Sequence, residues 1–245
     1  MTETLSLRAK IEQSPMGAYQ WMIVVMAAIM NLLDGFDVLA LAFTATAIRG
    51  EFGLTGIELG YLLSAGLFGM TAGSLFLAPL ADKIGRRPLL LMAVSLSAIG
   101  MLGSAFISQY QWLGFWRVIT GLGVGGILVG TNVITSEYSS RKWRSFAISV
   151  YAAGFGIGAV LGGMFAVMLQ GEYGWRSVFL AGAILTGLLL VVLFIWLPES
   201  IDFLTSKQPK NAEVRLNLIA KKIGLAGDWK LPAKVEKVKS KLPIS

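Results

Sequence analysis

Long apolar stretches alternate with short polar connections along most of this chain. A helix that crosses the hydrocarbon core of a bilayer needs about 20 predominantly apolar residues. Six stretches meet that requirement, at about 20–48, 59–81, 89–107, 112–135, 145–170 and 177–198. A polar segment precedes them at 1–19, and a longer one follows at 199–245. The pattern predicts an all-α fold, a polytopic membrane bundle of six transmembrane helices.

Composition narrows the function classes. Only 14% of the 245 residues are charged, against about 25% in soluble domains, and 55% are hydrophobic. The chain has no cysteine and no histidine, which excludes disulfides, thiol catalysis and the usual zinc sites. No set of nucleophile, base and orienting group is visible, so we expect no enzyme activity, no metal and no cofactor. Proton exchange in such a chain depends on Asp or Glu.

Lys and Arg fall almost entirely on one side of the predicted membrane. The two flanking segments and the connections 82–88 and 136–144 hold eighteen of the 21 Lys and Arg residues. Arg49 and Arg176 lie in the alternate connections. The positive-inside rule therefore places both termini in the cytoplasm. The net charge of +7 reflects this topology, so we expect a lipid bilayer and no nucleic acid as partner.

Two aspartates stand near the middle of the first stretch, where charge is costly. A charged side chain at the bilayer centre costs about 2.5–3.5 kcal/mol on insertion scales, and such residues are functional by default. Asp34 and Asp37 are three residues apart and share a helix face with Asn31, one turn earlier. Two neighbouring carboxylates in a low dielectric favour protonation of one of them, as a proton-coupled carrier requires. The alternative is a structural pair that is hydrogen-bonded or ion-paired within the bundle.

A third ionisable residue, Arg117, lies in the fourth stretch after Trp112 and Trp116, which resemble interfacial anchors. Its guanidinium can either snorkel to that interface or face the interior of the bundle. Facing inward, it would hold an aspartate ionised or bind an anionic substrate through a bidentate carboxylate contact.

Small and polar residues within the stretches indicate how the helices meet. Glycines recur every four residues on three stretches: Gly154, Gly158 and Gly162, then Gly121 and Gly125, then Gly69 and Gly73. Such stripes let helix backbones approach closely in lipid, either as plain packing or where helices slide. Four polar residues are candidates for lining a cavity or for hydrogen bonds between helices: Asn31, Tyr61, Asn132 and Tyr151.

The two basic connections carry complementary charges. Their candidate residues are Asp82, Gly85, Arg86 and Arg87 in the first and Glu137, Arg141 and Arg144 in the second. Gly85 permits the tight turn that a short link between helices demands. We expect the charges to form salt bridges on the inner face, as a gate that holds one conformation and opens in another. The alternative is that they only fix the topology.

Residues 78–87, Ala-Pro-Leu-Ala-Asp-Lys-Ile-Gly-Arg-Arg, resemble the signature loop of the major facilitator superfamily. The Asp-x-x-Gly-Arg-Arg core is intact, although Ala78 stands where the pattern usually begins with glycine. Further matches are Arg117 with Gly121, Gly-Trp-Arg at 174–176 and Leu-Pro-Glu-Ser at 197–200. The resemblance implies alternating access by a rocker switch, with a central site between two six-helix halves. It assigns residues 82 and 85–87 to the inner gate.

A narrower resemblance lies in the first stretch, where Asp34-Gly35-Phe36-Asp37 looks like the signature of the aromatic acid:proton symporter family. Residues 135–144 resemble the loop of that family after the fourth span, although Ser140 replaces a common proline. The resemblance implies proton-driven uptake of an aromatic carboxylate such as benzoate, a hydroxybenzoate or protocatechuate across a bacterial cytoplasmic membrane. It implies proton coupling or substrate response for Asp34 and Asp37, and proton transfer or anion handling for Arg117.

The number of spans departs from the superfamily, which normally has twelve. The segment 199–245 resembles the central loop between the halves, with an amphipathic helix near 211–223 that Gly224 ends. We therefore expect a truncated chain, the N-terminal half of a carrier, whose partner is the missing half. Three alternatives stay open: a carrier for another organic anion, a homodimer of two six-span chains, and a membrane scaffold or sensor that does not transport.

Overall fold

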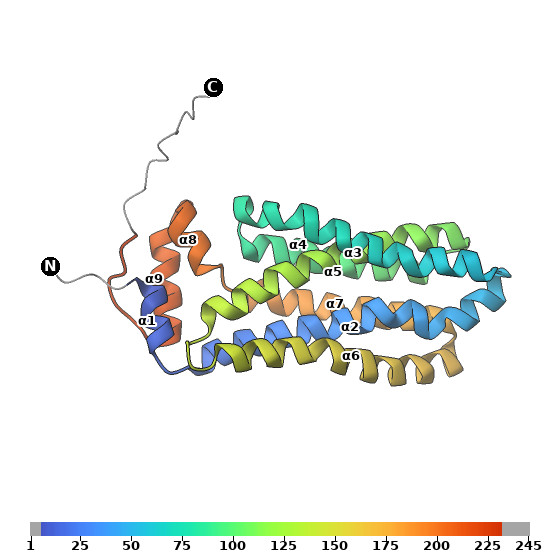
Figure 1. The fold of residues 1–245 in the computed structure, drawn as a ribbon, viewed down its shortest axis with the longest axis horizontal. Helices are drawn as coiled ribbons and strands as arrows, with labels where there is room; N and C mark the ends of the chain where they lie inside the picture. Colours follow the sequence, from blue (N-terminus) through green and yellow to red (C-terminus); the bar gives the residue numbers. More distant parts are fainter. Residues whose placement is uncertain (1–5, 232–245) are drawn as a thin grey trace, which may run out of the picture.

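The computed structural model describes residues 6–231, and the regular structure in that range is α-helical. The helices in that range are α1 (Leu7–Gln13), α2 (Ala18–Phe52), α3 (Gly56–Ile84), α4 (Arg86–Ala105), α5 (Tyr110–Tyr138), α6 (Arg144–Tyr173), α7 (Trp175–Trp196), α8 (Ile201–Lys207) and α9 (Ala212–Ile223). The six from α2 to α7 are long and apolar enough to cross a membrane (Figure 1). The predicted all-α bundle of six transmembrane helices is therefore confirmed.

Most of the membrane helices run past the apolar stretches of the sequence, because helical structure continues into the interfacial regions. The 35 residues of α2 span about 52 Å, well beyond a hydrocarbon core of roughly 30 Å. This helix ends at Gly53, whose φ of 63° lies in the left-handed region that glycine adopts readily. The next helix starts with a capping box, in which Thr55 and Glu58 each accept the other's backbone N–H. The turn between α2 and α3 is therefore fixed by local sequence.

The six spans form two triplets, α2–α4 and α5–α7, and the middle helix of each triplet packs on the other triplet. The middle helix of the first, α3, packs along α5, and the middle helix of the second, α6, packs along α2. Contacts of α4 with α5 and α7, and of α2 with α5 and α7, close the centre. The two middle helices therefore lie on opposite sides of the bundle and are its least buried spans (Figure 1).

Glycines close both of these helix crossings through direct backbone contact. A Cβ at Gly73 of α3 would lie within 3 Å of backbone atoms of Leu122 in α5. A Cβ at Gly158 of α6 would meet the backbone of Leu32 in α2 in the same way. Both glycines belong to the stripes seen in the sequence, which therefore serve close packing in this structure.

Three short helices, α1, α8 and α9, gather at one end of the bundle (Figure 1). Leu7 and Ile11 of α1 share a buried apolar cluster with Leu216 and Ile219 of α9 and with residues of the long helices. Helix α9 occupies the position predicted for the amphipathic segment and stops at Gly224, whose φ is 84°. These three helices, together with residues 82–87, 137–144 and 197–200 beside them, are called the basic end below.

Candidate functional site

Asp34, Asp37 and Arg117 are buried together near the middle of the bundle. Their exposed fractions are 2%, 1% and 3%. Both aspartates come from the middle of α2, and the arginine comes from the first half of α5. Burying charged groups is costly unless they are paired or hydrogen-bonded. Their bonding partners therefore decide what the site can do.

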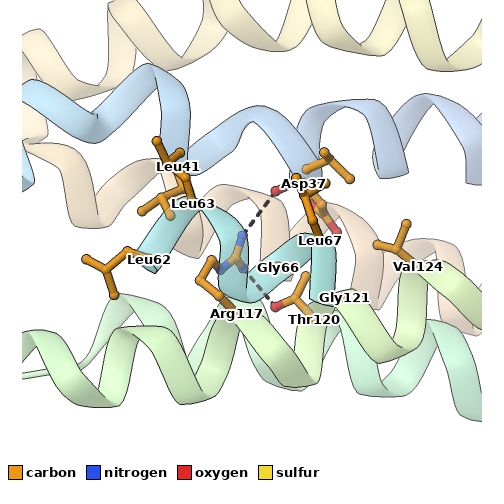
Figure 2. Close-up of a pocket in the computed structure, with 11 residues that line it drawn as sticks. Asp37, Leu41, Leu62, Leu63, Gly66, Leu67, Arg117, Thr120, Gly121 and Val124 are labelled. Atoms are coloured by element: carbon orange, nitrogen blue, oxygen red, sulfur yellow. Dashed lines mark hydrogen bonds between the residues drawn. The ribbon is translucent and has the colours of Figure 1, made fainter. Parts of the chain in front are cut away.

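Arg117 faces the interior of the bundle. Its Nη1 donates to the backbone carbonyl oxygen of Asp37 at 3.0 Å, and its Nη2 donates to Thr120 Oγ1 at 2.7 Å (Figure 2). The same Nη2 lies 2.8 Å from Met101 Sδ, and the guanidinium carbon lies 5.0 Å from the ring centre of Phe179. The structure thus selects the inward-facing alternative over snorkelling to the interface.

The guanidinium of Arg117 binds the backbone of Asp37 rather than its carboxylate. The ion pairs within residues 6–231 do not include this arginine, and its Nε has no hydrogen-bond partner there. A permanent positive charge is therefore held by a carbonyl, a hydroxyl, a thioether and one aromatic face. Because a guanidinium has five donors, it retains capacity to bind an anionic group.

Ser97 of α4 positions the carboxylate of Asp37. Its hydroxyl donates to Asp37 Oδ2 at 2.7 Å, and its exposed fraction is 0%. Ser95 and Ser104 on the same helix instead donate to carbonyls one turn back on their own helix. The sequence did not single out Ser97, because the hydroxyl of a serine in an apolar span usually donates to a carbonyl of its own helix. Only its three-dimensional neighbour distinguishes it.

Asp34 and two neighbouring residues on α2 have side-chain oxygens that accept no hydrogen bond from the residues that the structure describes. Its Oδ2 has no hydrogen-bond donor in the described part of the chain, and the same holds for Asp37 Oδ1 and Asn31 Oδ1. The amide of Asn31 donates to the backbone carbonyl of Tyr151 at 2.9 Å, and so ties α2 to α6. Buried polar atoms are normally hydrogen-bonded, so three free acceptors this close along one helix are exceptional. Protonation of a carboxylate would provide the missing donor.

A cavity of about 30 Å³ lies beside this polar group, between α2, α3 and α5 (Figure 2). Asp37, Arg117 and Thr120 form its polar wall, and apolar side chains form the rest, among them Leu41, Leu62, Leu63, Leu67 and Val124. The volume suits a water molecule or two, far below the roughly 300 Å³ of a site for an organic ligand. In this conformation the site can exchange a proton or hold water, but it cannot hold an aromatic ring.

The four polar candidates for cavity lining separate into two groups. Asn31 and Tyr151 are buried, and the tyrosine hydroxyl lies 3.5 Å from the carbonyl of Leu128. Tyr61 on α3 is 73% exposed, and Asn132 on α5 is also exposed on the bundle. None of the four lines the 30 Å³ cavity. The first pair therefore bonds between helices, and the second pair faces outward from the six helices.

At the basic end, two buried carboxylates cap the N-termini of helices. Glu137 accepts from the Ser200 hydroxyl at 2.9 Å and from the backbone N–H of Ile201 at 2.8 Å, at the start of α8. Glu199 Oε1 accepts from the backbone N–H groups of Arg86 at 2.8 Å and Arg87 at 3.0 Å, at the start of α4. The first backbone N–H groups of a helix lack intrahelical partners and attract negative charge. Carboxylates therefore stabilise both helix starts.

The expected salt bridges between the two basic connections are not formed between residues 6 and 231. Asp82 pairs with Arg86 at 2.6 Å within its own connection, and Arg144 pairs with Glu12 of α1 at 2.6 Å. Arg141 is exposed and contributes its backbone N–H to the carbonyl of Glu12. The carboxylate of Glu137 instead accepts from Ser200 and Ile201 at the start of α8. The two connections are joined instead through α1 and the segment after α7.

Three further contacts complete the basic end. Arg87 Nη2 donates to the backbone carbonyl of Phe194 at 2.6 Å, and Gly85, with a φ of 104°, packs against the Glu199 carboxylate. Arg8 of α1 forms an ion pair with Asp202 of α8. The residue that sequence reasoning missed here is Glu199. Its place in the Leu-Pro-Glu-Ser segment was a signal, but the helix that it caps begins more than 100 residues earlier.

Six apolar spans in two triplets, with buried charges at their centre, define an integral multi-pass membrane protein built like one half of a secondary transporter. The model of the Major Facilitator Superfamily matches residues 27–235, and the chain belongs to this superfamily. Its members that resemble the chain are transporters, not enzymes.

Two relatives come from Pseudomonas putida. The chain is 36% identical over 204 residues to a gallate transporter and 34% identical over 216 residues to the 4-hydroxybenzoate transporter PcaK. These matches cover 83% and 88% of this chain, but only 45% and 48% of the relatives. The chain therefore spans about half the length of the curated relatives it matches.

A solved structure shows the same fold. The proton:xylose symporter XylE from E. coli, bound to 6-bromo-6-deoxy-D-glucose, is similar with a TM-score of 0.75 at 22% identity. The match covers 86% of this chain and 50% of that one. At this identity the similarity concerns the fold alone, and it agrees with six helices that form one half of a major facilitator fold.

Proposed function

We propose that this chain forms the N-terminal half of a proton-coupled transporter that takes up an aromatic carboxylate, such as benzoate, a hydroxybenzoate or protocatechuate. The observation that carries the proposal is the similarity to a gallate transporter and to a 4-hydroxybenzoate transporter, since both substrates are hydroxylated benzoates. The buried charges at the centre of the bundle support it, because they provide one cation for a carboxylate and two acids for a proton.

In this proposal, Arg117 binds the substrate carboxylate. Its Nε has no hydrogen-bond partner in the described residues, and its side chain lines the same cavity as the leucines of α2 and α3. Because the cavity is too small for an aromatic ring, the substrate enters a more open arrangement of the same walls. Its carboxylate then replaces neutral acceptors around the guanidinium, and its ring packs on the leucine side chains.

The coupling proton is carried by Asp34 and Asp37. Each has at least one carboxylate oxygen without a donor, and no cation is paired with either within residues 6–231. Protonation removes a buried negative charge and supplies a donor, so it stabilises the closed arrangement of the site. Protons are the coupling ion, and no cofactor takes part.

We further propose that the basic end faces the cytoplasm and serves as the inner gate, and that a second six-helix unit completes the pathway. The gate residues are Asp82, Gly85, Arg86, Arg87, Glu137, Arg141 and Arg144. In transporters of this kind the path lies between two repeats, and this chain spans about half the length of its relatives. On this view the polar residues exposed on α3 and α5, Tyr61 and Asn132, face the second unit across the path.

Uptake of radiolabelled 4-hydroxybenzoate or gallate into bacterial cells tests the proposal. The chain is expressed alone, and also together with the second half of the gallate transporter from Pseudomonas putida. We expect uptake with both halves that stops when a protonophore collapses the proton gradient. Uptake that ignores the protonophore would contradict proton coupling.

The same experiment separates the alternatives. Uptake by the chain alone would establish a homodimeric carrier in place of a half. Accumulation of another organic anion, without any of the aromatic acids, would replace the substrate class. A folded chain that supports no uptake in either form would favour a scaffold or sensor, for which Asp34 and Asp37 are dispensable.

A further inference from the structure

A pocket of about 240 Å³ lies where α9 meets the ends of α4 and α7. Three cationic side chains line it, Arg87 from α4 and Arg215 and Lys222 from α9. Tyr19, Trp196 and Leu218 also line it. The pocket lies at the basic end, away from the buried charges at the centre of the bundle, and of its lining residues only Arg87 belongs to the proposed inner gate.

The pocket lies at the depth of lipid headgroups. The 22 residues of α7 span about 33 Å, close to the thickness of a hydrocarbon core, and Trp196 ends the helix. Trp196 is 50% exposed, as expected of a tryptophan in the aromatic belt at a membrane–water interface. The adjoining α9 exposes Val214 and Leu218 beside its basic residues, a composition typical of a helix that lies in the interface.

An apolar groove between α4 and α7 adjoins this pocket, and several of its side chains are exposed on the bundle, among them Ile99, Val191 and Phe194. Its volume is about 690 Å³, and it is lined by Leu91, Met92, Ser95, Leu96, Ile99, Leu190, Val191 and Phe194. The groove and the pocket meet at one contact, where Arg87 Nη2 donates to the carbonyl of Phe194 and the guanidinium lies 5.9 Å from its ring centre. One molecule with an anionic head and an apolar chain fits both.

The charges of the pocket favour an anion. Its single carboxylate, Glu199, is engaged through Oε1 by three backbone N–H groups, those of Arg86, Arg87 and Ser200. Arg215 is exposed and makes no ion pair between residues 6 and 231, and Lys222 lies over the ring of Tyr19 at 5.3 Å. Three cations therefore face one carboxylate whose charge is already partly compensated.

A second apolar groove shows what is specific to the first. It lies between α2 and α6, has a volume of about 730 Å³, and is lined by residues that include Leu39, Phe43, Val160 and Met164. No charged side chain lines it.

We propose that α4, α7 and α9 form a binding site for one anionic phospholipid, with an acyl chain in the α4–α7 groove and its phosphate between Arg87, Arg215 and Lys222.

Binding of defined lipids to the purified chain tests the proposal. The chain in mild detergent is titrated with phosphatidylglycerol or with phosphatidylcholine of the same acyl composition, and bound lipid is counted by native mass spectrometry. We expect one phosphatidylglycerol to be retained about tenfold more tightly than phosphatidylcholine, since basic residues near the membrane surface attract anionic headgroups. Equal retention of the two lipids would overturn the proposal.

Matched variants locate the headgroup. The double variant Arg215→Gln/Lys222→Gln is expected to weaken phosphatidylglycerol about tenfold and to leave phosphatidylcholine unchanged. The control Lys210→Gln/Lys221→Gln removes the same charge from exposed lysines that do not line the pocket, and it should weaken binding less than twofold. Equal losses in the two double variants would show a general attraction to the basic end and would refute a defined site.

A second pair of variants tests the groove, and soluble anions test the need for a lipid. Met92→Trp fills the α4–α7 groove and should reduce retention of phosphatidylglycerol about fivefold or more, whereas Met164→Trp in the other groove should not. Glycerol phosphate and inorganic phosphate at millimolar concentration should displace little lipid. Full displacement by either would show that the pocket binds a free phosphate instead. Circular dichroism of each variant verifies that the bundle is folded.

Discussion

Buried carboxylates at the basic end and at the centre of this bundle differ in how far they are hydrogen-bonded. At the basic end, both oxygens of Glu137 accept hydrogen bonds, and Glu199 collects three backbone N–H groups on one oxygen. In the middle of the membrane, Asp34 and Asp37 each leave at least one oxygen without a donor in the described residues. The four side chains are similarly buried, with exposed fractions of 6% or less. Burial therefore does not separate the two groups, whereas hydrogen bonding does.

In the proposed function, this difference separates a region that carries the coupling proton from a region that stabilises the fold. A satisfied carboxylate at a helix N-terminus stabilises one arrangement of the chain. A buried carboxylate with an unpaired oxygen raises the free energy of the folded state, and such groups are typical of functional sites. Removal of a charge should therefore reduce transport in the middle of the membrane, and should reduce stability at the basic end.

The largest effect is expected at the centre. Asp34→Asn and Asp37→Asn should each lower proton-driven uptake about 100-fold, because an amide cannot carry the proton. Their free energy of unfolding should stay within about 1 kcal/mol of the parent, since an amide removes an incompletely satisfied charge. Uptake is measured with both halves present, and stability by thermal unfolding in detergent. Loss of stability with uptake preserved would reverse the assignment of the two regions.

Glu137→Ala should have the converse result. It leaves the Ser200 hydroxyl and the N–H of Ile201 without an acceptor, and should cost about 2 kcal/mol of stability. The midpoint of thermal unfolding is then lowered by about 5 °C. Glu172→Ala, at an exposed position in α6, is the control and should change the midpoint by less than 1 °C, because exposed substitutions are nearly neutral. Equal midpoints for the two variants would show that the cap contributes nothing.

A smaller effect sharpens the comparison within the centre itself. Ser97→Ala removes the hydroxyl that positions Asp37 and should lower uptake about tenfold, as expected from the loss of a hydrogen bond to a charged group. Ser95→Ala removes only a bond within α4 and should stay within about twofold. The pH at which uptake is half-maximal should shift for Ser97→Ala and not for Ser95→Ala. A shift in neither variant would remove Ser97 from the site.

The smallest effect concerns an ion pair at the surface of the basic end. The hydrogen bond from Arg144 lowers the pKa of Glu12 below its ordinary value of 4.5. A pKa lowered in the folded state adds stability above pH 4.5 that is lost as the pH falls through the lowered pKa. Because the pair is solvent-exposed, the contribution is about 0.3 kcal/mol. Glu12→Gln should therefore differ slightly from the parent in unfolding midpoint at pH 6 and match it at pH 3, and a difference that grows toward pH 3 would contradict the sign.

The sequence predicted the spans and the three central charges for the same physical reason. Length and hydrophobicity are properties of consecutive residues, and an Asp in an apolar run is conspicuous without knowledge of its neighbours. The inward orientation of Arg117 did not follow, because snorkelling and burial both agree with a position near the end of a span. Its contacts with Asp37 and Phe179 come from other helices and depend on how those helices cross.

The contacts of the basic end were predicted least well, although its charges were all noted. Complementary signs in the two connections predicted salt bridges between them on the inner face. Charge patterns do not include the backbone N–H groups of helix ends, which compete for the same carboxylates. Glu137 and Glu199 are held by such groups, and each binds the N–H groups of a helix start that lies more than 60 residues away in the sequence. The hydrogen-bond partners of these two carboxylates therefore depend on which helix N-termini the fold brings next to them.

The crossing of the two triplets bears on how the chain is made. Gly35 of α2 packs against backbone atoms of Phe155 and Ala159 in α6, about 120 residues later in synthesis. At roughly 5–20 residues per second, α2 waits for some 6–24 s before its packing partner leaves the ribosome. During that interval its two aspartates lie in the membrane without α6, and for the first part of it also without α4 and α5, whose Ser97 and Arg117 contact Asp37. Early steps of insertion therefore have to shelter α2, through the translocation machinery or through protonation, until the second triplet arrives.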